Sequence, residues 1–462
     1  MKARLLQIYY RFLWFLARRY IAKSKPFIIG INGSVGKTSC RMIISQTLQT
    51  LLPHMSIYTS PKNFNGELWM SLSIFEIEKY TPSIMGMISV LFIAIRKLLS
   101  RPSSTNVLIL EYGIDHPWEM SFLLSIAKPD VSVHTQIDAV HSLQFWNPHS
   151  IAKEEFLLQQ NTRSVVFLNA DDPYISHAQN TIPCDVISYS ANGWSEDTTI
   201  TIAPSIQIPN VTLNHTAQSG YITYNNSKTI SLWINILWRY HLSYAAVWAC
   251  IADIVSYRLT KKEALQAWQH LNVAIQLQPW RWSIFNGIHD SIIVDSSYNA
   301  SPRSVKQLLH EVSDRRNKKH PTRKLLFVLG DMRELGTQEE KEHLELALFL
   351  QSYDASVFLV GNVMATIVEP YFGQHWPWRL HSIFSFGTYK EAGEAIREHL
   401  QQHQHEKYIV VFKGSQNTIF LEESIKYILA NKADESKLTR QGAWRAKTKQ
   451  DFLTKALQPK GV

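Results

Sequence analysis

The segment GINGSVGKTS, residues 30–39, combines small residues, a lysine and hydroxyl side chains in a spacing typical of phosphate-binding loops. Small residues let the backbone turn tightly, so that its N–H groups point at phosphate oxygens. Lys37 could then reach the β- and γ-phosphates of a nucleotide, and Thr38 could bind Mg²⁺. Ile31 occupies the position of the first glycine in the strict pattern, and Gly30 and Gly33 flank it. The nucleotide-binding candidates are Gly33, Ser34, Val35, Gly36, Lys37, Thr38 and Ser39.

Three further side chains that could serve a metal follow this loop in the sequence. Glu111 comes directly after the apolar run Val107–Leu110, His141 lies in HTQIDAVHSLQF, and Lys153 lies in IAKEEF. Ligands of open α/β sheets bind at the carboxyl ends of the strands, and a carboxylate there is suited to hold Mg²⁺. A single His or Lys on a loop is ordinarily a solvated side chain. Taken together, and in this order after a phosphate-binding loop, the three residues become informative.

Alternating apolar and helical stretches predict a parallel sheet that positions these side chains. Phe27–Ile31 is expected to be a buried strand, and Thr38–Leu52 has the apolar spacing of a helix. Further strands are expected at Val107–Leu110, Val131–Thr135 and Val165–Leu168. From about Cys184 to Ile236, alternation of Thr, Ile, Val and Tyr between Asn and Gly turns predicts antiparallel strands. A pair of helices is expected from about His241 to Leu271.

A second α/β domain of dinucleotide-binding type is expected after QLQPWRW, whose proline and lack of periodicity place a boundary near Leu277. Its predicted strands are Ser291–Val294, Lys324–Leu329, Ser356–Val360 and Tyr408–Phe412. We therefore expect an N-terminal amphipathic helix over residues 1–26, a central nucleotide-binding domain over 27–277 and a C-terminal domain over 278–462.

The composition is that of a globular protein with more than one core, because 462 residues exceed what a single core accommodates. The net charge of +9 suits an anionic partner, which could be nucleic acid, an acidic membrane surface or a phosphorylated small molecule. The basic residues form no long stripe, so we expect no nucleic-acid partner. Cys40, Cys184 and Cys250 are too few for a disulfide framework or a four-cysteine zinc site, and a reducing compartment fits them.

Two apolar segments, Leu5–Ala17 and Ile84–Ile95, raise the question of a membrane. Both are shorter than the roughly 20 residues that a spanning helix needs. No small-residue cleavage site follows the first one, so a signal peptide is not expected. We interpret both as helices packed on the protein. The alternative is a weak, shallow attachment of the N-terminal helix to the inner face of a membrane.

From Phe27 onward the sequence resembles the Mur ligase family. The resemblance rests on the phosphate-binding loop and on five later motifs in family order: EYGIDHPWEM, LNADDP, DSSYNASP, GDMRELG followed by His343, and FKGSQN. It implies ATP as the nucleotide and two Mg²⁺ ions. Thr38 and Glu111 would bind the first ion, and His141 and a carbamylated Lys153 the second. Lys37, Glu111, His141 and Lys153 would be the catalytic residues.

The resemblance also assigns residues outside the loop. Arg281 and Asp295 match positions that contact the nucleotide, with Tyr298 and Asn299 beside them. An arginine suits phosphate oxygens, and an aspartate can accept hydrogen bonds from ribose hydroxyls. For SYNASP, a plain structural turn remains the alternative. The substrate-binding candidates are Asn63, Asn65, Lys413 and Ser415.

The implied activity is that of a cytoplasmic, monomeric, ATP-dependent amide ligase of peptidoglycan precursor synthesis, which joins D-alanyl-D-alanine to a UDP-linked muramoyl peptide. Only about 26 residues precede the first strand, far below a minimal domain, so the family's usual UDP-binding domain is not expected here. Tyr244 stands near the position of an adenine-contacting Asn, and Trp118 stands where a Gly is usual. The alternatives are a ligase for another amino acid or a lipid-linked acceptor, and a nucleotide-binding scaffold without catalysis.

Overall fold

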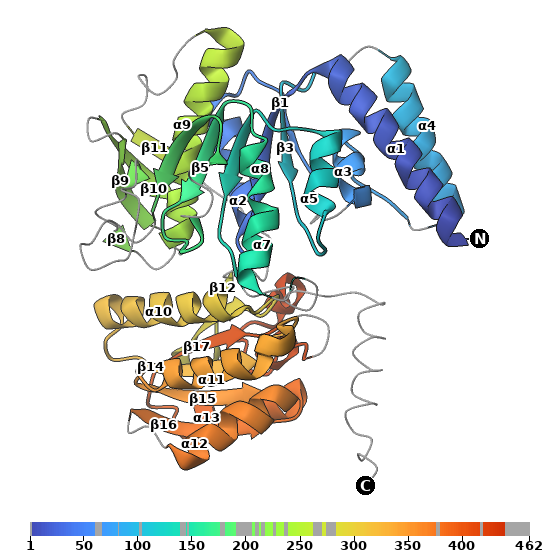
Figure 1. The fold of residues 1–462 in the computed structure, drawn as a ribbon. Helices are drawn as coiled ribbons and strands as arrows, with labels where there is room; N and C mark the ends of the chain where they lie inside the picture. Colours follow the sequence, from blue (N-terminus) through green and yellow to red (C-terminus); the bar gives the residue numbers. More distant parts are fainter. Residues whose placement is uncertain are drawn as a thin grey trace. The chain divides into compact units, whose positions relative to one another are not determined.

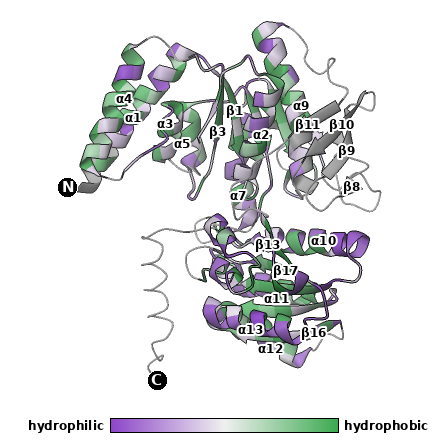
Figure 2. Cartoon of the chain, turned by 180° about the vertical axis from the view of Figure 1, so that it is seen from behind, coloured by the Kyte–Doolittle hydropathy of each residue, from purple (hydrophilic) through white to green (hydrophobic). Residues whose placement is uncertain are grey.

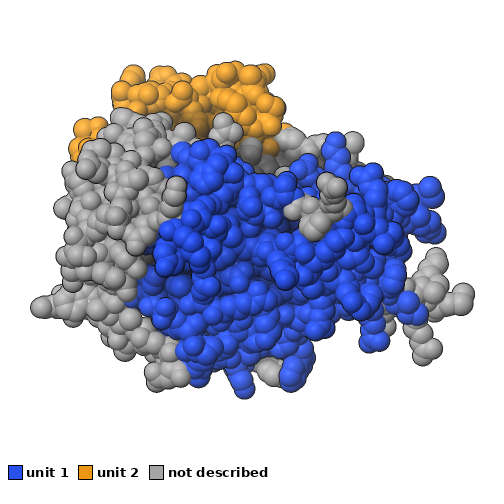
Figure 3. All heavy atoms as spheres, turned by 90° about the horizontal axis from the view of Figure 1, so that it is seen from above, with its two compact units in different colours: residues 1–137, 144–276 blue, residues 138–143, 277–462 orange. Residues whose placement is uncertain are grey.

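A computed structural model of the chain divides into two compact units, which Figure 3 colours separately. Unit 1 comprises residues 1–137 and 144–276, and unit 2 comprises residues 138–143 and 277–462. The structure describes residues 2–60, 67–81, 83–100, 104–138, 145, 147–175, 181–190, 206–207, 212–213, 218–224, 228–234, 239–261, 270–273, 283–375, 379–415 and 419–438. We describe each unit by itself.

Strand β1 (Phe27–Asn32) is an inner strand of the unit 1 sheet, and all its residues are buried. It pairs in parallel with β3 (Val107–Glu111) on one side and β4 (Val131–His134) on the other. Continuous apolar runs are typical of parallel strands buried on both faces, which explains why the sequence predicted these three strands. Within the described residues the order is β11-β10-β9-β7-β6-β5-β4-β1-β3-β2, with β8 paired to β9. The remaining strands are β2 (Ile57–Thr59), β5 (Val165–Asn169), β6 (Asp185–Tyr189), β7 (Ile206–Gln207), β8 (Thr212–Leu213), β9 (Gln218–Tyr224), β10 (Lys228–Ile234) and β11 (His270–Val273).

The far end of this sheet corrects two predictions. The stretch expected to be antiparallel begins with β6, which instead continues the parallel part by pairing with β5. The antiparallel pairing is between β9 and β10 and between β7 or β8 and β9. The helices expected up to Leu271 are wrong at their end, because α9 (Arg239–Thr260) is followed by β11, parallel to β10. The segment HLNV has four residues, two of them apolar, and is too short for its period to distinguish strand from helix.

Helices pack on this sheet and on one another (Figure 1). They are α1 (Lys2–Ser24), α2 (Lys37–Leu51), α3 (Glu67–Ile74), α4 (Ile84–Leu99), α5 (Glu119–Ile126), α7 (Pro148–Glu155), α8 (Leu157–Gln160) and α9. Helix α1 contacts α3, α4 and α5 and buries Leu13, Ala17 and Tyr20 in the unit 1 core. Both predicted apolar helices therefore pack one side against the protein. Across the described residues, no helix has the length and apolar character needed to cross a membrane.

Unit 2 has its own sheet, in the order β12-β13-β17-β14-β15-β16 within the described residues. Only β12 is antiparallel to its neighbour. Alternate side chains of β14 pack into two different apolar clusters. One cluster contains Leu325, Phe327 and Leu329, and the other contains Leu326 and Val328. The α/β fold class is confirmed in both units.

The elements of unit 2 have the following bounds. The strands are β12 (Ser283–Asn286), β13 (Ile292–Ser296), β14 (Lys324–Gly330), β15 (Ala355–Val360), β16 (Leu380–Phe386) and β17 (Tyr408–Lys413). The helices are η4 (Ile288–Asp290), α10 (Pro302–Lys319), η5 (Gly336–Gln338), α11 (Glu339–Leu350), η6 (Met364–Val368), α12 (Glu369–Gln374), α13 (Tyr389–Gln402), α14 (Glu422–Ile425) and η7 (Lys432–Lys437). Strands β12 and β16 were not predicted from the sequence.

Candidate nucleotide site

The phosphate-binding loop joins the end of β1 to the start of α2, and two of its residues must be glycine. Gly33 has φ +121° and Gly36 has φ +90°, in a region that L side chains rarely adopt. A Cβ at Gly33 would overlap the Thr135 hydroxyl, and one at Gly36 would overlap the Tyr244 hydroxyl. Tyr244 is buried on α9, so it packs against the loop from inside unit 1.

The segment after β4 holds the loop from its other side. Ser34 and Val35 donate their N–H groups to the Gln136 carbonyl, at 2.7 and 3.3 Å. The Thr135 hydroxyl lies 2.8 Å from the Asn32 carbonyl oxygen and 2.6 Å from that of Val35. The Lys37 ammonium donates to the Gly33 carbonyl. The buried Ser34 hydroxyl has no hydrogen-bond partner in the described part of the chain, and a phosphate oxygen could accept from it.

Thr38 and Glu111, the first pair of predicted metal ligands, lie side by side. The Thr38 hydroxyl is 3.4 Å from Glu111 Oε2 at the buried end of β3. A hydroxyl and a carboxylate are hard oxygen donors that fit Mg²⁺. Sequence reasoning missed Arg41, whose guanidinium pairs with the other Glu111 oxygen and also bonds Thr59 and Ser60. Its place one helical turn after Thr38 was the available signal.

Glu155 is a second residue that the sequence did not single out. Its Oε2 accepts the Gly33 N–H at 3.1 Å, and its backbone carbonyl accepts from the Asn32 side chain at 2.7 Å. The side chain is buried, and loss of hydration raises the pKa of its carboxyl, against the lowering effects of the Lys37 charge and the Gly33 N–H. A titratable group thus holds the first amide of the phosphate loop.

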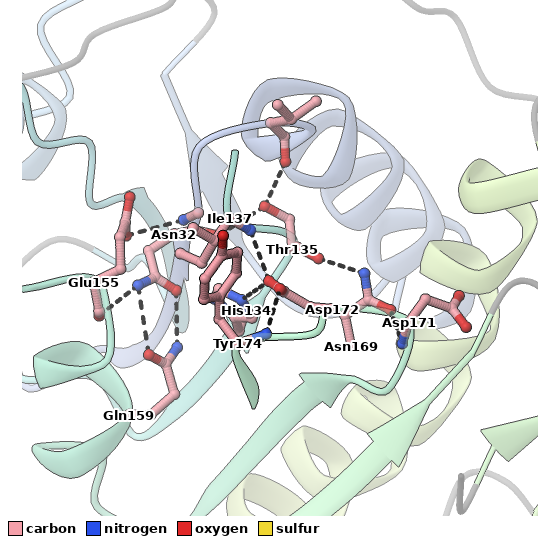
Figure 4. Close-up of polar contacts among 12 residues, drawn as sticks. Asn32, His134, Thr135, Ile137, Glu155, Gln159, Asn169, Asp171, Asp172 and Tyr174 are labelled. Atoms are coloured by element: carbon pink, nitrogen blue, oxygen red, sulfur yellow. Dashed lines mark hydrogen bonds and ion pairs between the residues drawn. The ribbon is translucent and has the colours of Figure 1, made fainter. Parts of the chain in front are cut away.

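The motif LNADDP braces the same region from the end of β5 (Figure 4). The Asn169 side chain donates to the Thr135 carbonyl at 2.6 Å. Asp172 Oδ2 lies 2.8 Å from His134 Nε2 and accepts the Ile137 N–H at 2.6 Å. These contacts fix the residues that in turn hold the loop. The contacts of this motif therefore position the loop.

Of the two residues predicted to form the second metal site, only Lys153 lies within the described residues. The Lys153 side chain is exposed on α7 and makes no hydrogen bond or ion pair in the described part of the chain. The acids beside it bind elsewhere, because Glu154 accepts the Met120 N–H at 3.0 Å and Glu155 accepts that of Gly33. His141, Asn63, Asn65 and Arg281 lie outside the described residues. Within the described ranges, no group of three or more His, Cys, Asp or Glu could hold a metal ion.

In unit 2, several predicted residues meet at the carboxyl ends of β13 and β17. Asp295 is buried and accepts from the backbone and hydroxyl of Ser297, at 3.0 and 2.6 Å. Lys413 donates to the Ser296 hydroxyl at 3.2 Å. Ser415 donates to the Ala300 carbonyl at 3.2 Å and accepts the Arg333 N–H at 3.0 Å. In the turn that follows β13, Tyr298 is half-buried and Asn299 is exposed.

His343, which follows the GDMRELG motif, has a structural position. Its Nε2 lies 3.1 Å from the Met332 N–H, and its Nδ1 lies 2.7 Å from the Glu339 carbonyl oxygen. The ring is therefore neutral, accepting at Nε2 and donating at Nδ1. Burial lowers the pKa of His343, against the raising effects of the Glu339 carbonyl and the Asp331 charge.

Trp118, where the resemblance leads us to expect a glycine, has an unusual backbone conformation for its residue type. It has φ +75° at the start of α5, and its side chain is exposed. A bulky residue is disfavoured in this left-handed conformation, which suits glycine. The backbone thus keeps the shape for which the usual glycine is suited.

A glycine-rich loop between a parallel strand and a helix, with Thr38 beside a strand-end carboxylate, defines the arrangement of P-loop nucleotide-binding proteins. The Mur ligase middle domain matches residues 31–246, and the Mur ligase glutamate ligase domain matches residues 280–415. The chain belongs to the Mur ligase family.

Individual relatives agree with this family. The UDP-N-acetylmuramoyl-tripeptide–D-alanyl-D-alanine ligase of Bacillus subtilis is 24% identical over 90% of this chain and 78% of its own length. Two solved structures share the fold with TM-scores of 0.66. MurF of Acinetobacter baumannii is 16% identical, with 89% of this chain and 79% of that one covered. MurF ligase of Thermotoga maritima, in complex with ADP, is 18% identical, with 92% and 84% covered.

Proposed function

We propose that this chain is an ATP-dependent amide ligase that joins D-alanyl-D-alanine to a UDP-N-acetylmuramoyl tripeptide. The observation that carries the catalytic part is the phosphate loop with Thr38 beside Glu111. The printed activity of the Bacillus subtilis relative supports the choice of substrates. The ADP in the Thermotoga maritima structure supports ATP as the phosphoryl donor.

The reaction passes through an acyl phosphate. The carboxylate of the peptide attacks the γ-phosphorus of ATP, and ADP leaves. The amine of D-alanyl-D-alanine then attacks the acyl carbon, phosphate leaves with the bonding electrons, and the amine loses a proton as the amide forms. Carboxylate and amine do not condense unaided in water, so the protein must orient both and stabilise the charge on the transferred group.

The chain's own residues divide this work. Loop N–H groups and Lys37 bind the β- and γ-phosphates. Thr38 and Glu111 would hold Mg²⁺, which neutralises charge on the phosphates when bound. His141 and a carbamylated Lys153 would hold a second ion. Arg41 pairs with Glu111 Oε1, so Oε2, the oxygen that lies beside Thr38, is the one that would bind the metal.

The remaining assignments concern binding. Arg281 and Asp295, with Tyr298 and Asn299, would contact the nucleotide from the C-terminal domain. Lys413 and Ser415 would contact the peptide, and Asn63 and Asn65 the UDP-linked end. We place the enzyme in the cytoplasm and expect a monomer, which light scattering of the purified chain would test.

The test is mass spectrometry of products formed from UDP-muramoyl tripeptide, ATP and D-alanyl-D-alanine. We expect a new mass equal to the sum of the tripeptide and dipeptide substrates less one water, together with ADP and phosphate. Phosphate release should require both the UDP-muramoyl tripeptide and D-alanyl-D-alanine. Lys37→Ala is the matched control, expected to remain folded and to release no phosphate. A product formed only with another amino acid or with a lipid-linked acceptor would overturn the substrate assignment. ATP binding without acceptor-dependent phosphate release would overturn catalysis.

A further inference from the structure

Large apolar side chains gather at the surface of two helices of unit 1. Of the sixteen large apolar residues exposed in the described part of the chain, ten lie on α1 and α4. We define the α1–α4 surface by these ten: Leu6, Ile8, Phe12, Phe15, Ile84, Met85, Ile88, Phe92, Ile95 and Leu99. Figure 2 shows α4 coloured largely as hydrophobic and α1 as a mixture of hydrophobic and hydrophilic residues. Such a concentration marks an interaction site more often than scattered single residues do.

The two helices lie side by side and run in the same direction. The Tyr9 hydroxyl donates to the Met87 carbonyl at 3.1 Å, near the start of both helices. The Lys23 ammonium donates to the carbonyls of Leu98 and Ser100 at 2.6 and 2.5 Å, near the end of both. Because the contacts advance together along the two helices, α1 and α4 are parallel neighbours over most of the length of α4.

Each helix has a second apolar side that is already used inside unit 1. Leu13 and Ala17 of α1 and Val90 and Ala94 of α4 are buried in its core. On α4, positions 85, 88, 92, 95 and 99 follow the 3-4 spacing of a single helical stripe. Phe92 in this stripe is 67% exposed and Ile88 is 55% exposed. Helix α4 is therefore apolar on two sides, and the described residues pack against only one of them.

The charges of both helices have a single sign. Helix α1 contains six lysines and arginines, α4 contains two, and neither contains an acidic residue. Because the helices are parallel, Arg18 and Arg19 of α1 lie towards the same end of the pair as Arg96 of α4. Lys97 of α4 instead pairs with Glu76 at 2.5 Å, and Lys23 of α1 donates to backbone carbonyls. The Arg19 guanidinium lies 5.2 Å from the centre of the Phe15 ring, so cationic and apolar groups adjoin.

We propose that the α1–α4 surface binds the interface of an anionic phospholipid bilayer. The apolar side chains would insert shallowly between lipids, and the arginines would contact the phosphate headgroups. Helix α4 has 16 residues, about 24 Å at 1.5 Å per residue, less than the ~30 Å hydrocarbon core. Helix α1 has 23 residues but lacks the apolar character of a spanning helix, so both helices would lie in the plane of the interface.

Charge selects the bilayer over a second copy of this chain. Two copies joined through this surface would bring basic residues together with no acidic residue of either helix to offset them. An anionic lipid surface supplies both an apolar layer and negative charge. This inference concerns location and stands independently of the proposed reaction.

The experiment measures co-sedimentation of the full chain with vesicles of phosphatidylcholine alone or mixed with phosphatidylglycerol. We expect binding to the anionic vesicles and at least about ten-fold weaker binding to the neutral ones. Ile88→Ser/Phe92→Ser and, separately, Arg18→Gln/Arg19→Gln should each weaken anionic binding by about ten-fold or more. Leu348→Ser, at a residue 54% exposed on α11 of unit 2, is the matched control and should bind like the parent chain.

Circular dichroism and phosphate release in the absence of vesicles should be the same for all four proteins, since the changed side chains are exposed. Failure of the parent chain to sediment with anionic vesicles would overturn the proposal. Equal binding by the parent and the Ile88→Ser/Phe92→Ser variant would overturn it as well. If light scattering shows self-association that this variant abolishes, and vesicles are not bound, the surface joins copies of the chain and the lipid assignment is wrong.

Discussion

Lys153 stands exposed on α7, while the two acids that follow it bind other groups. Neither acid is therefore available as its simple ion-pair partner. An ammonium would repel Mg²⁺, whereas reaction of the neutral amine with carbon dioxide gives an anionic oxygen ligand that hard cations prefer. We predict that Lys153→Ala loses most acceptor-dependent phosphate release and regains part of it with added formate or acetate, which can supply a carboxylate oxygen.

Alkylamines distinguish this role from a plain phosphate contact. Rescue by amines and not by carboxylates would show that Lys153 acts through its positive charge. Lys128→Ala is the control, because Lys128 is also exposed in unit 1 and bonds only the Asn161 side chain among the described residues. It should keep the activity of the parent chain. An unimpaired Lys153→Ala variant would contradict both roles.

Glu155 makes the stability of the phosphate loop depend on pH. Because its folded-state pKa is raised, the stability that it contributes is fully present below its ordinary value of 4.5 and is lost as pH rises through the folded value. Glu155→Gln keeps an acceptor for the Gly33 N–H without the buried charge. We predict a variant more stable than the parent at pH 7.5, with a difference that shrinks towards pH 4.5, measured by urea unfolding.

The paired variant Glu155→Ala removes the acceptor altogether. It should lose about 1–3 kcal/mol of unfolding free energy, the usual cost of leaving a buried donor without its partner. A stability difference between Glu155→Gln and the parent that stays constant with pH would contradict the role given to the carboxyl.

Sequence reasoning could propose those site residues that a local pattern marks. Lys37 and Thr38 belong to one short loop, and Glu111 ends an apolar run, so all three could be named without a fold. Glu155 and the Thr135 brace could not, and Tyr244 was named without its contact to Gly36, because each acts on the loop from about a hundred residues or more away in the sequence. A lone Glu, Tyr or Thr carries no signal until its partner is known.

At the scale of elements, His343 ties the start of α11 to the loop that follows β14. The neutral ring joins Met332 to Glu339, and its lowered pKa means that stability is complete above its ordinary value of 6.5 and is lost as pH falls. His343→Phe fills similar space but cannot accept from Met332. We predict a loss of about 1–3 kcal/mol at pH 8.

The stability of the parent chain should fall between pH 8 and pH 5.5, and that of His343→Phe should fall less. Denaturant unfolding at both pH values would measure the difference. His310→Phe, on the exposed side of α10, is the control and should change stability by less than about 0.5 kcal/mol. If both variants were equally stable at pH 8, the hydrogen bonds of His343 would not matter to this connection.

Strands were predicted best where the sequence has a continuous run of apolar residues. The strands β1, β3, β14 and β17 are continuous apolar runs and were found nearly to their bounds. Strand β16 was missed, since LHSIFSF is half exposed and its pairing with β15 depends on a partner about 25 residues away. The short β11 was taken for helix because four residues are too few to show a period.

At the scale of the whole chain, α1 is part of unit 1 and not a detachable appendage. Trp14 packs against Phe122 with ring centres 3.9 Å apart, and Tyr20 lies 5.5 Å from Phe75. Deleting the residues before Lys25 would expose these partners. We predict a markedly lower thermal midpoint, since each large buried side chain contributes about 1.5–3 kcal/mol.

Differential scanning calorimetry of the truncated chain would measure this loss. Phe12→Ser changes only an exposed residue of the same helix and should leave the midpoint close to that of the parent. A truncated chain as stable as the parent would show that α1 is dispensable to unit 1. Point substitutions are therefore better probes of the α1–α4 surface than truncation.

The sheet order has a consequence for synthesis on the ribosome. Strand β1 emerges early, but both its neighbours, β3 and β4, are translated roughly a hundred residues later, about 5–20 s at 5–20 residues per second. The glycine loop gains the Gln136 carbonyl with β4, the Glu155 carboxyl with α7, and the Tyr244 ring only with α9. The nascent chain thus carries its nucleotide loop unfinished through most of unit 1, because the Tyr244 contact with the loop can form only after translation has passed residue 244.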